Sequence, residues 1–165
     1  MDSAGNVVRE TAWTGSGGGI SPVEPEPSYQ VNFGIMSGGQ RGVPDVSYVA
    51  SGNSCLAAFD SINEGGFVDW ICVGGTSVGT PQWAALVAIV NSMRSLPLSS
   101  VSFGTNTVLY GIASASYSTA YRDITVGSNG SCGSICTAGP GYDFVTGLGS
   151  PLANNLVPAM AKARV

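Results

Sequence analysis

The chain of 165 residues, 44% of them hydrophobic, is long enough to bury a sizeable core as one globular domain. Its net charge is −4 and no cluster of Lys and Arg occurs, which argues against nucleic acid as a partner. No histidine is present, so serine or cysteine catalysis with a histidine base is excluded, as is every zinc site that needs imidazole. The longest apolar run, Trp83–Val90, is far too short to span a bilayer, and we expect no membrane partner.

Charged residues make up 10% of the chain against roughly 25% in typical proteins, and 24 residues are glycine. Few ionisable groups leave little charge to gain or lose as the pH changes. This composition suits a secreted protein that works in an acidic medium. We therefore expect an extracellular location.

The cysteines occur in two clusters, Cys55 with Cys72 and Cys132 with Cys136. Four cysteines allow three pairings, and the clustering favours the two local disulfides. A zinc site built from four thiolates would want C-x2-C knuckles, which neither spacing supplies. Free buried thiols remain the alternative. Two disulfides would agree with an oxidising compartment.

Residues 1–30 are rich in loop-forming residues. Glycine and serine dominate Trp13–Ser21, and the prolines that follow forbid regular helix and favour extended or turn structure. A linker would not usually carry Trp13 and Ile20, so we expect an ordered surface that faces a ligand. The next segment, Tyr29–Gly34, fits either a short helix or a short strand.

An alternating segment, Arg41–Ala50, predicts a strand that is entered through a proline. Asp45 within it is a candidate catalytic acid. An aspartate at a strand entrance more often accepts backbone N–H groups or pairs with a nearby arginine such as Arg41. We therefore prefer the structural role for Asp45.

Two short strands, Leu56–Phe59 and Phe67–Val73, are predicted to form a hairpin through the polar turn Asp60–Gly66. The second strand runs directly into the glycines Gly74 and Gly75. A strand, a tight turn and a helix in this order would expose a residue of the turn at the carboxyl end of a sheet.

Pro81 fixes the start of the next helix. A proline inside a helix costs roughly 3 kcal/mol unless it lies in the first turn, so the helix must begin between Ser77 and Thr80. Unpaired backbone N–H groups and the positive end of the helix dipole converge near Ser77, which suits a nucleophile whose reaction creates an oxyanion. The glycines before it would let a substrate backbone approach closely. A helix cap is the alternative role for Ser77.

This helix is expected to stop near Ser95, because Pro97 disfavours helical geometry in the residue before it. A further short helix is predicted at Thr107–Ala115. At the end of the chain, Leu152–Ala163 is predicted as a terminal helix with Pro151 at its first position.

Asp123 and Asp143 bracket a glycine-rich loop whose backbone can expose carbonyl oxygens. Carboxylates and carbonyls are the hard oxygen ligands that Ca²⁺ prefers, at a coordination completed by water. No EF-hand pattern is present. The alternative is that each aspartate belongs to a turn of its own, and the spacing alone favours that alternative.

Taken together, several segments in this order resemble the sedolisin family, the serine-carboxyl peptidases of the subtilisin-like fold. The matching segments are Ser16–Ser21 with Pro27–Gln30, Arg41–Val46, Gly75–Pro81, Arg122–Thr125 and Gly139–Pro151. The resemblance implies an α/β fold with a subtilisin-like parallel sheet and flanking helices, of which only the C-terminal part is present. Residues 1–165 would then form that portion, with a nucleophile segment at 74–95 and a calcium loop at 121–150.

The resemblance also assigns roles to residues. Ser77 would be the nucleophile that forms an acyl-enzyme with a peptide or protein substrate. Residues of the substrate cleft would be Ser16, Gly17, Gly18, Gly19, Gly75 and Thr76. One Ca²⁺ ion would be bound by the side chains of Asp123 and Asp143 and the backbone carbonyls of Ile124, Gly139 and Gly141.

The chain departs from the family in its acidic residues. The family uses a glutamate as base, oriented by an aspartate four residues away on one helical face, and a further aspartate at the oxyanion, all upstream of the Ser16 segment. Asp60 and Glu64 are four apart but in reversed order and in a turn. We therefore expect the isolated chain to be inactive and its apolar sheet surface to need the missing N-terminal half of the catalytic domain as a partner. The alternatives are a non-catalytic calcium-binding or peptide-binding module and an incomplete portion with no separate function.

Overall fold

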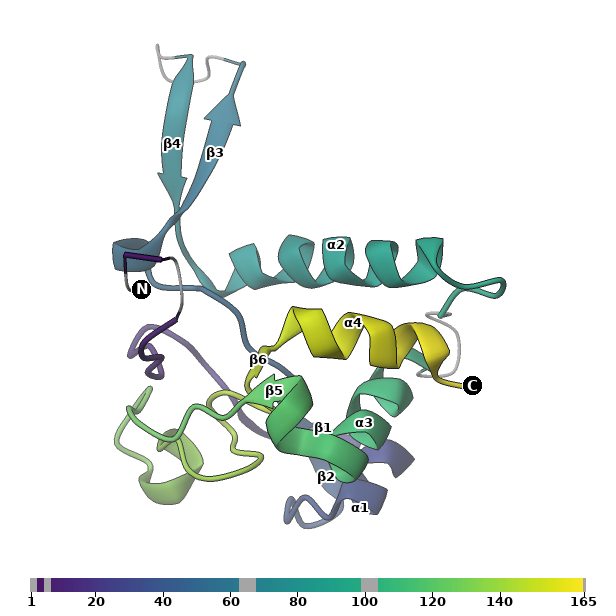
Figure 1. Ribbon diagram of the computed structural model, residues 1–165. Coiled ribbons are helices and arrows are strands. Elements are labelled where there is room, and N and C mark those ends of the chain that lie inside the picture. The colour runs from purple at the N-terminus through teal and green to yellow at the C-terminus, as the bar shows by residue number, and fades with distance from the viewer. Residues whose placement is uncertain (1–2, 5–6, 63–67, 99–103, 165) are drawn as a thin grey trace.

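The computed structural model describes residues 3–4, 7–62, 68–98 and 104–164. Figure 1 shows α2 and α4 lying side by side, α3 and α1 on the far side of α4, and one hairpin that rises away from the helices. The helices are α1 (Ser28–Phe33), α2 (Gly79–Ser92), α3 (Gly104–Ala120) and α4 (Ala153–Lys162). The strands are β1 (Gly19–Pro25), β2 (Gln40–Val43), β3 (Leu56–Asp60), β4 (Asp69–Val73), β5 (Tyr121–Arg122) and β6 (Ser150–Pro151).

The hydrophobic core lies where α4 packs against α2 and α3, with α1 packed on α3. Buried residues four apart provide the facing sides, Leu86 and Val90 on α2 and Leu156 and Met160 on α4. This spacing places each pair on one face of its helix. The core is therefore built by helices rather than by a sheet.

Arg94 joins the end of α2 to the end of α4. Its Nη1 donates to the carbonyls of Met160, Ala161 and Ala163, at 2.8, 3.2 and 2.7 Å. These carbonyls lie at the carboxyl end of α4, where helical partners run out and the dipole favours a cation. The guanidinium therefore caps α4 from outside.

The described strands form three two-stranded sheets, each of them antiparallel. The parallel sheet predicted from the sequence is thus not present among the described residues. A parallel pair needs a crossover of a dozen or more residues between its strands, whereas β3 and β4 are joined by the short segment 61–68 and must run antiparallel. The α/β character of the chain consists of these small sheets set beside the helices.

The strand predicted at Arg41–Ala50 is shorter in the structure, because β2 ends at Val43. Beyond it the backbone bonds to a distant loop instead of a neighbouring strand. Leu148 N donates to the Asp45 carbonyl and Ser47 N donates to the Gly149 carbonyl, at 2.8 and 3.0 Å. The backbone of this segment is thus paired without a strand, and residues 44–47 are all partly buried.

Other predicted boundaries shift by a few residues. Tyr29–Gly34, which fitted either state, lies largely in helix α1, and α3 extends well beyond the predicted Thr107–Ala115. Helix α2 ends at Ser92, short of the predicted Ser95. Pro151 does not begin the terminal helix, because Ser150 and Pro151 pair with β5 and α4 starts at Ala153.

The β3–β4 hairpin was predicted correctly, although Glu64 and Phe67 lie outside the described residues. Both local disulfides are present, Cys55–Cys72 at the base of the hairpin and Cys132–Cys136 in the loop before α4. Along the described parts of the chain, none of the helices has the length and apolar character needed to cross a bilayer.

Loss of the Cys55–Cys72 bond is expected to destabilise the protein more than loss of Cys132–Cys136. The two bonds close loops with sequence separations of 17 and 4, and in the chain-entropy model the longer loop gives the larger effect, about 3 kcal/mol. The measurement is the melting temperature of the two double Cys→Ser variants. A larger decrease for the Cys132–Cys136 variant would contradict this expectation.

Candidate active site

Ser77 lies in a single 3-10 turn, Thr76–Val78, that leads directly from β4 into α2. Helix α2 begins at Gly79 and has Pro81 in its first turn, so the predicted start between Ser77 and Thr80 is confirmed. The residue before the turn, Gly75, has a φ of +119°, a conformation that side chains rarely adopt. This glycine turns the chain sharply and leaves Ser77 exposed at the amino end of the helix.

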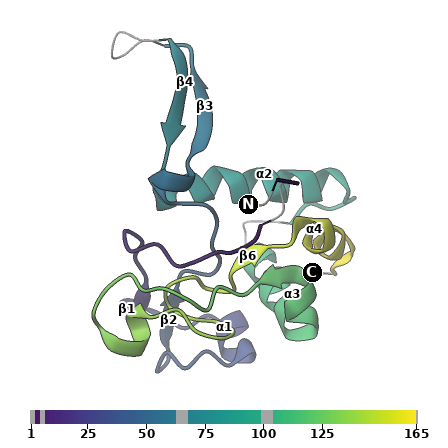
Figure 2. The ribbon, with the colours of Figure 1, turned by 60° about the vertical axis from the view of Figure 1, so that its left-hand side comes forward.

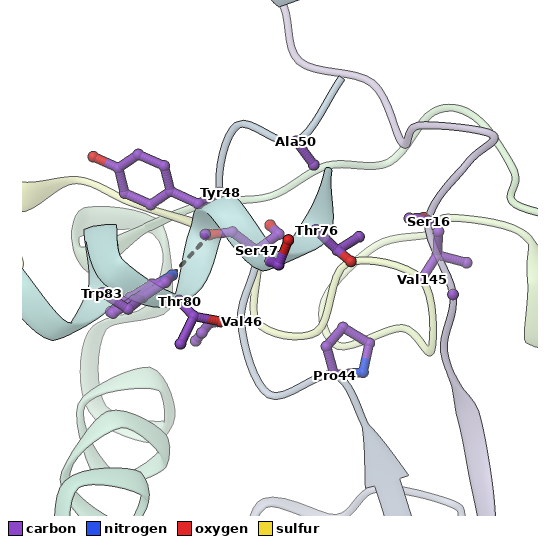
Figure 3. Close-up of a pocket in the computed structure, with 13 residues that line it drawn as sticks. Ser16, Pro44, Val46, Ser47, Tyr48, Ala50, Thr76, Thr80, Trp83 and Val145 are labelled. Carbon is purple, nitrogen blue, oxygen red and sulfur yellow. Dashed lines mark hydrogen bonds between the residues drawn. The ribbon is translucent and has the colours of Figure 1, made fainter. Parts of the chain in front are cut away.

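A pocket of about 540 Å³ opens beside Ser77. Figure 3 shows Tyr48 and Trp83 on one side of it and Ser16 and Val145 on the other. The lining comes from the glycine-rich segment, the segment after β2, the turn before α2, the first part of α2 and the loop before β6. The lining residues are Ser16, Gly17, Pro44, Val46, Ser47, Tyr48, Ala50, Thr76, Ser77, Gly79, Thr80, Trp83 and Val145.

The structure brings Ser16, Gly17 and Thr76 together with Ser77 in this pocket. Gly18 and Gly19 do not line it. A methyl group on Gly18 would overlap the carbonyl of Phe144, so glycine is required there for close packing of two backbones. Gly19 lies in β1, and Gly75 precedes the Thr76–Val78 turn and is not among the lining residues.

Two aromatic residues of the pocket were not predicted as site residues, Tyr48 and Trp83. Their rings meet edge to face at a centroid distance of 6.4 Å, and Trp83 Nε1 donates to the Ser47 carbonyl at 3.1 Å (Figure 3). Trp83 looked like part of an apolar core helix. Helical spacing could have indicated that Trp83 belongs to the site, since Thr80 and Trp83 are three residues apart and share one face of the helix.

The Asp45 carboxylate is held in a polar cluster and does not line the pocket beside Ser77. Arg41 forms an ion pair with it, as the structural interpretation predicted. Tyr110 Oη donates to Oδ1 at 2.9 Å and Gln30 Nε2 to the same atom at 3.2 Å. Asn106 Nδ2 donates to Oδ2 at 3.1 Å. Burial, and then the nearby Asp45 charge, raise the pKa of Tyr110 far above its ordinary value, so this phenol remains a donor.

Within the described part of the chain, no side chain forms a hydrogen bond with Ser77 Oγ. The lining of its pocket also contains no ionisable side chain apart from the Tyr48 phenol. A serine hydroxyl needs a base within hydrogen-bond reach before it becomes a strong nucleophile. The described residues therefore supply a positioned serine without a base.

The predicted calcium ligands lie around one turn. Asp123 Oδ2 accepts a hydrogen bond from Gly141 N at 2.9 Å, and Asp143 Oδ2 accepts one from Gly139 N at 3.0 Å. Asp143 is buried and also accepts from the N–H groups of Val145 and Thr146. Both carboxylates thus converge on the backbone at residues 139–141, next to the carbonyls that the prediction names.

The chemistry of this cluster fits Ca²⁺. Among the described residues no group of three or more His, Cys, Asp or Glu side chains gathers, so backbone carbonyls such as that of Ile124 would have to complete an all-oxygen site. Tyr117 Oη donates to Asp123 Oδ1 at 3.2 Å. Burial, followed by the charge of Asp123, raises the pKa of Tyr117 far above its ordinary value. Negative charge is therefore concentrated at this loop.

No protein-family model matches the chain. It is 35% identical to kumamolisin from Bacillus sp. (strain MN-32), over 96% of this chain and 29% of that protein. It is 32% identical to sedolisin from Pseudomonas sp. (strain 101), over 90% of this chain and 25% of that protein. Tripeptidyl-peptidase 1 from Canis lupus familiaris is 31% identical, over 89% of this chain and 28% of that protein. The chain thus spans less than a third of the length of these curated relatives.

The solved structure of Pseudomonas sedolisin, a serine-carboxyl proteinase complexed with two molecules of pseudo-iodotyrostatin, superimposes with a TM-score of 0.73. Sequence identity is 27%, and the match covers 96% of this chain and 42% of that chain. The fold and these relatives define the chain as an α/β protein that is similar, over part of their length, to the peptidases named above. It belongs to the sedolisin family.

Proposed function

We propose that this chain is the nucleophile-bearing, C-terminal portion of a sedolisin-type catalytic domain that cleaves peptide bonds. The observation that carries the proposal is the position of Ser77, exposed at the junction of a strand, a tight turn and a helix, beside a pocket that the Ser16 segment also lines. Ser77 Oγ would attack the carbonyl carbon of a peptide and form an acyl-enzyme. Ser16, Gly17, Gly18, Gly19, Gly75 and Thr76 would border the peptide in the cleft.

The proton of Ser77 Oγ must pass to a base when the new C–O bond forms. Asp45 is unsuited to this role, because its carboxylate is engaged by Arg41 and by three further donors. The described lining of the pocket beside Ser77 contains no carboxylate, and we propose that the base is a carboxylate from the N-terminal half of the domain. A carboxyl group serves as a base and then as an acid best in an acidic medium, near its own pKa.

To test this, the chain is combined with the missing N-terminal half, either as one polypeptide or as two separate chains, and peptide hydrolysis is measured. Peptide hydrolysis in acid is expected for the joined protein, with loss of hydrolysis on Ser77→Ala. Hydrolysis that survives Ser77→Ala would contradict the assignment of the nucleophile.

A non-catalytic calcium-binding or peptide-binding module is the second candidate. One observation favours it, namely that Ser77 Oγ has no base bonded to it among the described residues. Such a module would bind peptides whether or not the missing half is present. Peptide binding without hydrolysis by the joined protein would support this candidate over the first.

The proposed location is extracellular. Both disulfides and the small share of charged residues support it. Reducing agents are expected to be absent where the protein works.

The loop at 121–150 is proposed to bind one Ca²⁺ through Asp123, Asp143 and the carbonyls of Ile124, Gly139 and Gly141. When bound, the ion would supply positive charge that holds the carboxylates and the turn in place.

Calcium at a hundred times its dissociation constant is expected to stabilise the fold by about 2.7 kcal/mol. The measurement is the melting temperature with calcium and with EDTA. Asp123→Asn is expected to remove the calcium dependence, and Asp69→Asn, on the exposed hairpin, to leave it unchanged. Equal melting temperatures of wild-type protein in calcium and in EDTA would show that the site is wrong.

A further inference from the structure

The amino-terminal chain reaches the pocket beside Ser77 without forming a helix or a strand. Residues 10–16 are irregular apart from a turn at 14–15, and we call them the strap. In Figure 1 and Figure 2 the strap, in purple, runs beside the green loop that follows β5. It ends at Ser16, which lines the pocket together with Gly17. An irregular segment is fixed by the separate contacts that it makes, so the position of Ser16 depends on the contacts of the strap.

The carboxylate of Glu10 fixes the start of the strap. Its Oε2 accepts a hydrogen bond from Ser150 Oγ, whose residue is buried, and Arg122 Nε lies 3.7 Å from the same oxygen. Ser150 and Arg122 pair with each other in β6 and β5, so Glu10 holds the strap against this small sheet. The hydrogen bond is the stronger of the two contacts, because the ion pair is long and the Arg122 side chain is 36% exposed.

Two further contacts carry this anchoring on to Ser16. Ala12 N donates to the Val126 carbonyl at 2.8 Å, which ties the middle of the strap to the loop after β5. The Trp13 carbonyl accepts from both Ser16 N and Ser16 Oγ, at 3.0 and 2.8 Å. A methyl group on Gly15 would overlap the Trp13 ring, so glycine is needed for this tight turn. The strap thus forms an unbroken series of contacts from β5 and β6 to the wall of the pocket.

We infer that Glu10 is a positioning residue for the substrate, because it holds the strap on β5 and β6 and so sets the place of Ser16 and Gly17 in the pocket. This rests on the proposed function. Glu10 does not line the pocket beside Ser77, and it acts on a bound peptide through the strap alone. Its loss is expected to weaken peptide binding and to leave the position of Ser77 unchanged, since the turn between β4 and α2 holds that serine.

The experiment measures peptide binding by titration calorimetry, with oxidised insulin B chain as the probe. The parent protein is the chain joined to the N-terminal half and carrying Ser77→Ala, so that hydrolysis does not interfere. Glu10→Ala is expected to raise the dissociation constant about tenfold, the effect of losing one charge-assisted hydrogen bond. Glu10→Gln is expected to raise it less than about threefold, because the amide oxygen still accepts from Ser150 Oγ. Glu24→Ala, at an exposed glutamate of β1, is the matched control and should leave it unchanged.

Amide hydrogen exchange of the 165-residue chain tests the strap without any peptide. Glu10→Ala and Ser150→Ala are each expected to speed up exchange about tenfold at Ala12 and Ser16, whose N–H groups are hydrogen-bonded within this series of contacts. Exchange in helix α4 should stay unchanged, because its buried residues belong to the core and have no contact with Glu10.

The inference is overturned if Glu10→Ala binds the peptide as tightly as the parent protein, or if exchange at Ala12 and Ser16 is the same in both. A lower melting temperature with unchanged peptide affinity would show a purely structural role and would overturn it as well. A joined protein with Ser77 intact that leaves the peptide uncut, while Glu10→Ala weakens binding as expected, supports the role of Glu10 and contradicts the proposed function.

Discussion

The chain of 165 residues alone is expected to leave peptides uncut in acid, although it carries a positioned serine. A serine hydroxyl is a weak nucleophile until a base takes its proton, and the described residues place none beside Ser77 Oγ. Loss of members of such a catalytic unit lowers turnover by a factor on the order of 10⁴ to 10⁶. A loss of this size takes hydrolysis below ordinary detection.

The measurement compares peptide hydrolysis at about pH 4, where a carboxyl base and acid titrate together, for three proteins. These are the chain alone, the chain joined to the missing half, and the joined Ser77→Ala variant. Only the second should cleave. Strong Ser77-dependent cleavage by the chain alone would contradict the expectation, and Asp45 would then be the first base to test.

Asp45→Ala is expected to destabilise the fold by up to about 3 kcal/mol, the lower end of the effect of removing one partner of a fully buried ion pair, because this pair is partly buried. The side chains of Asp45 and Arg41 are only 15% and 25% exposed. The substitution would leave the guanidinium unpaired and would remove the acceptor shared by Gln30, Asn106 and Tyr110. These donors come from α1 and α3, and Arg41 lies in β2, so the loss would loosen several elements at once.

Urea unfolding of Asp45→Ala measures this effect. Asp69→Ala is the matched control, because Asp69 is an exposed aspartate on the hairpin and its loss should change stability by less than about 0.5 kcal/mol. Similar unfolding midpoints for the two variants would show that the cluster around Asp45 contributes little.

Local chemistry made some elements predictable from the sequence. Pro81 has no backbone N–H to donate, and this alone places the start of α2 correctly. The hairpin follows from two apolar segments around a polar turn, and the clustered cysteines predict both disulfides. In each case the determining interaction lies within a short stretch of sequence.

The elements that were predicted wrongly depend on hydrogen bonds between segments that are distant in the sequence. Arg41–Ala50 alternates like a strand, but beyond Val43 its backbone bonds to residues 148 and 149. Pro151 looked like the first residue of a helix, yet it pairs with Tyr121 in β5. The sequence indicates which residues are buried and cannot by itself say which backbone groups meet.

The candidate site, too, could be predicted only where local sequence or the family resemblance determines it. Ser77 was predicted from the turn, and the resemblance added Ser16, Gly17 and Thr76, which the structure brings into the same pocket. The wall formed by Tyr48 and Trp83 was missed: helical spacing places Trp83 on the same face as Thr80, but its contact with Tyr48 joins segments that are distant in sequence. Neither the sequence nor the structure identifies a base for Ser77, since the described residues place no carboxylate next to Ser77 Oγ.

The disulfide at the base of the hairpin gives the molecule tolerance to scission of its own backbone. Cys55 and Cys72 lie at the ends of β3 and β4 that are nearest to the helices. A peptide bond broken anywhere between them leaves the two pieces covalently joined, with the turn that holds Ser77 still tethered to the segment that precedes the hairpin. The hairpin can therefore be nicked between these cysteines without loss of covalent continuity between the segment before β3 and the turn that holds Ser77.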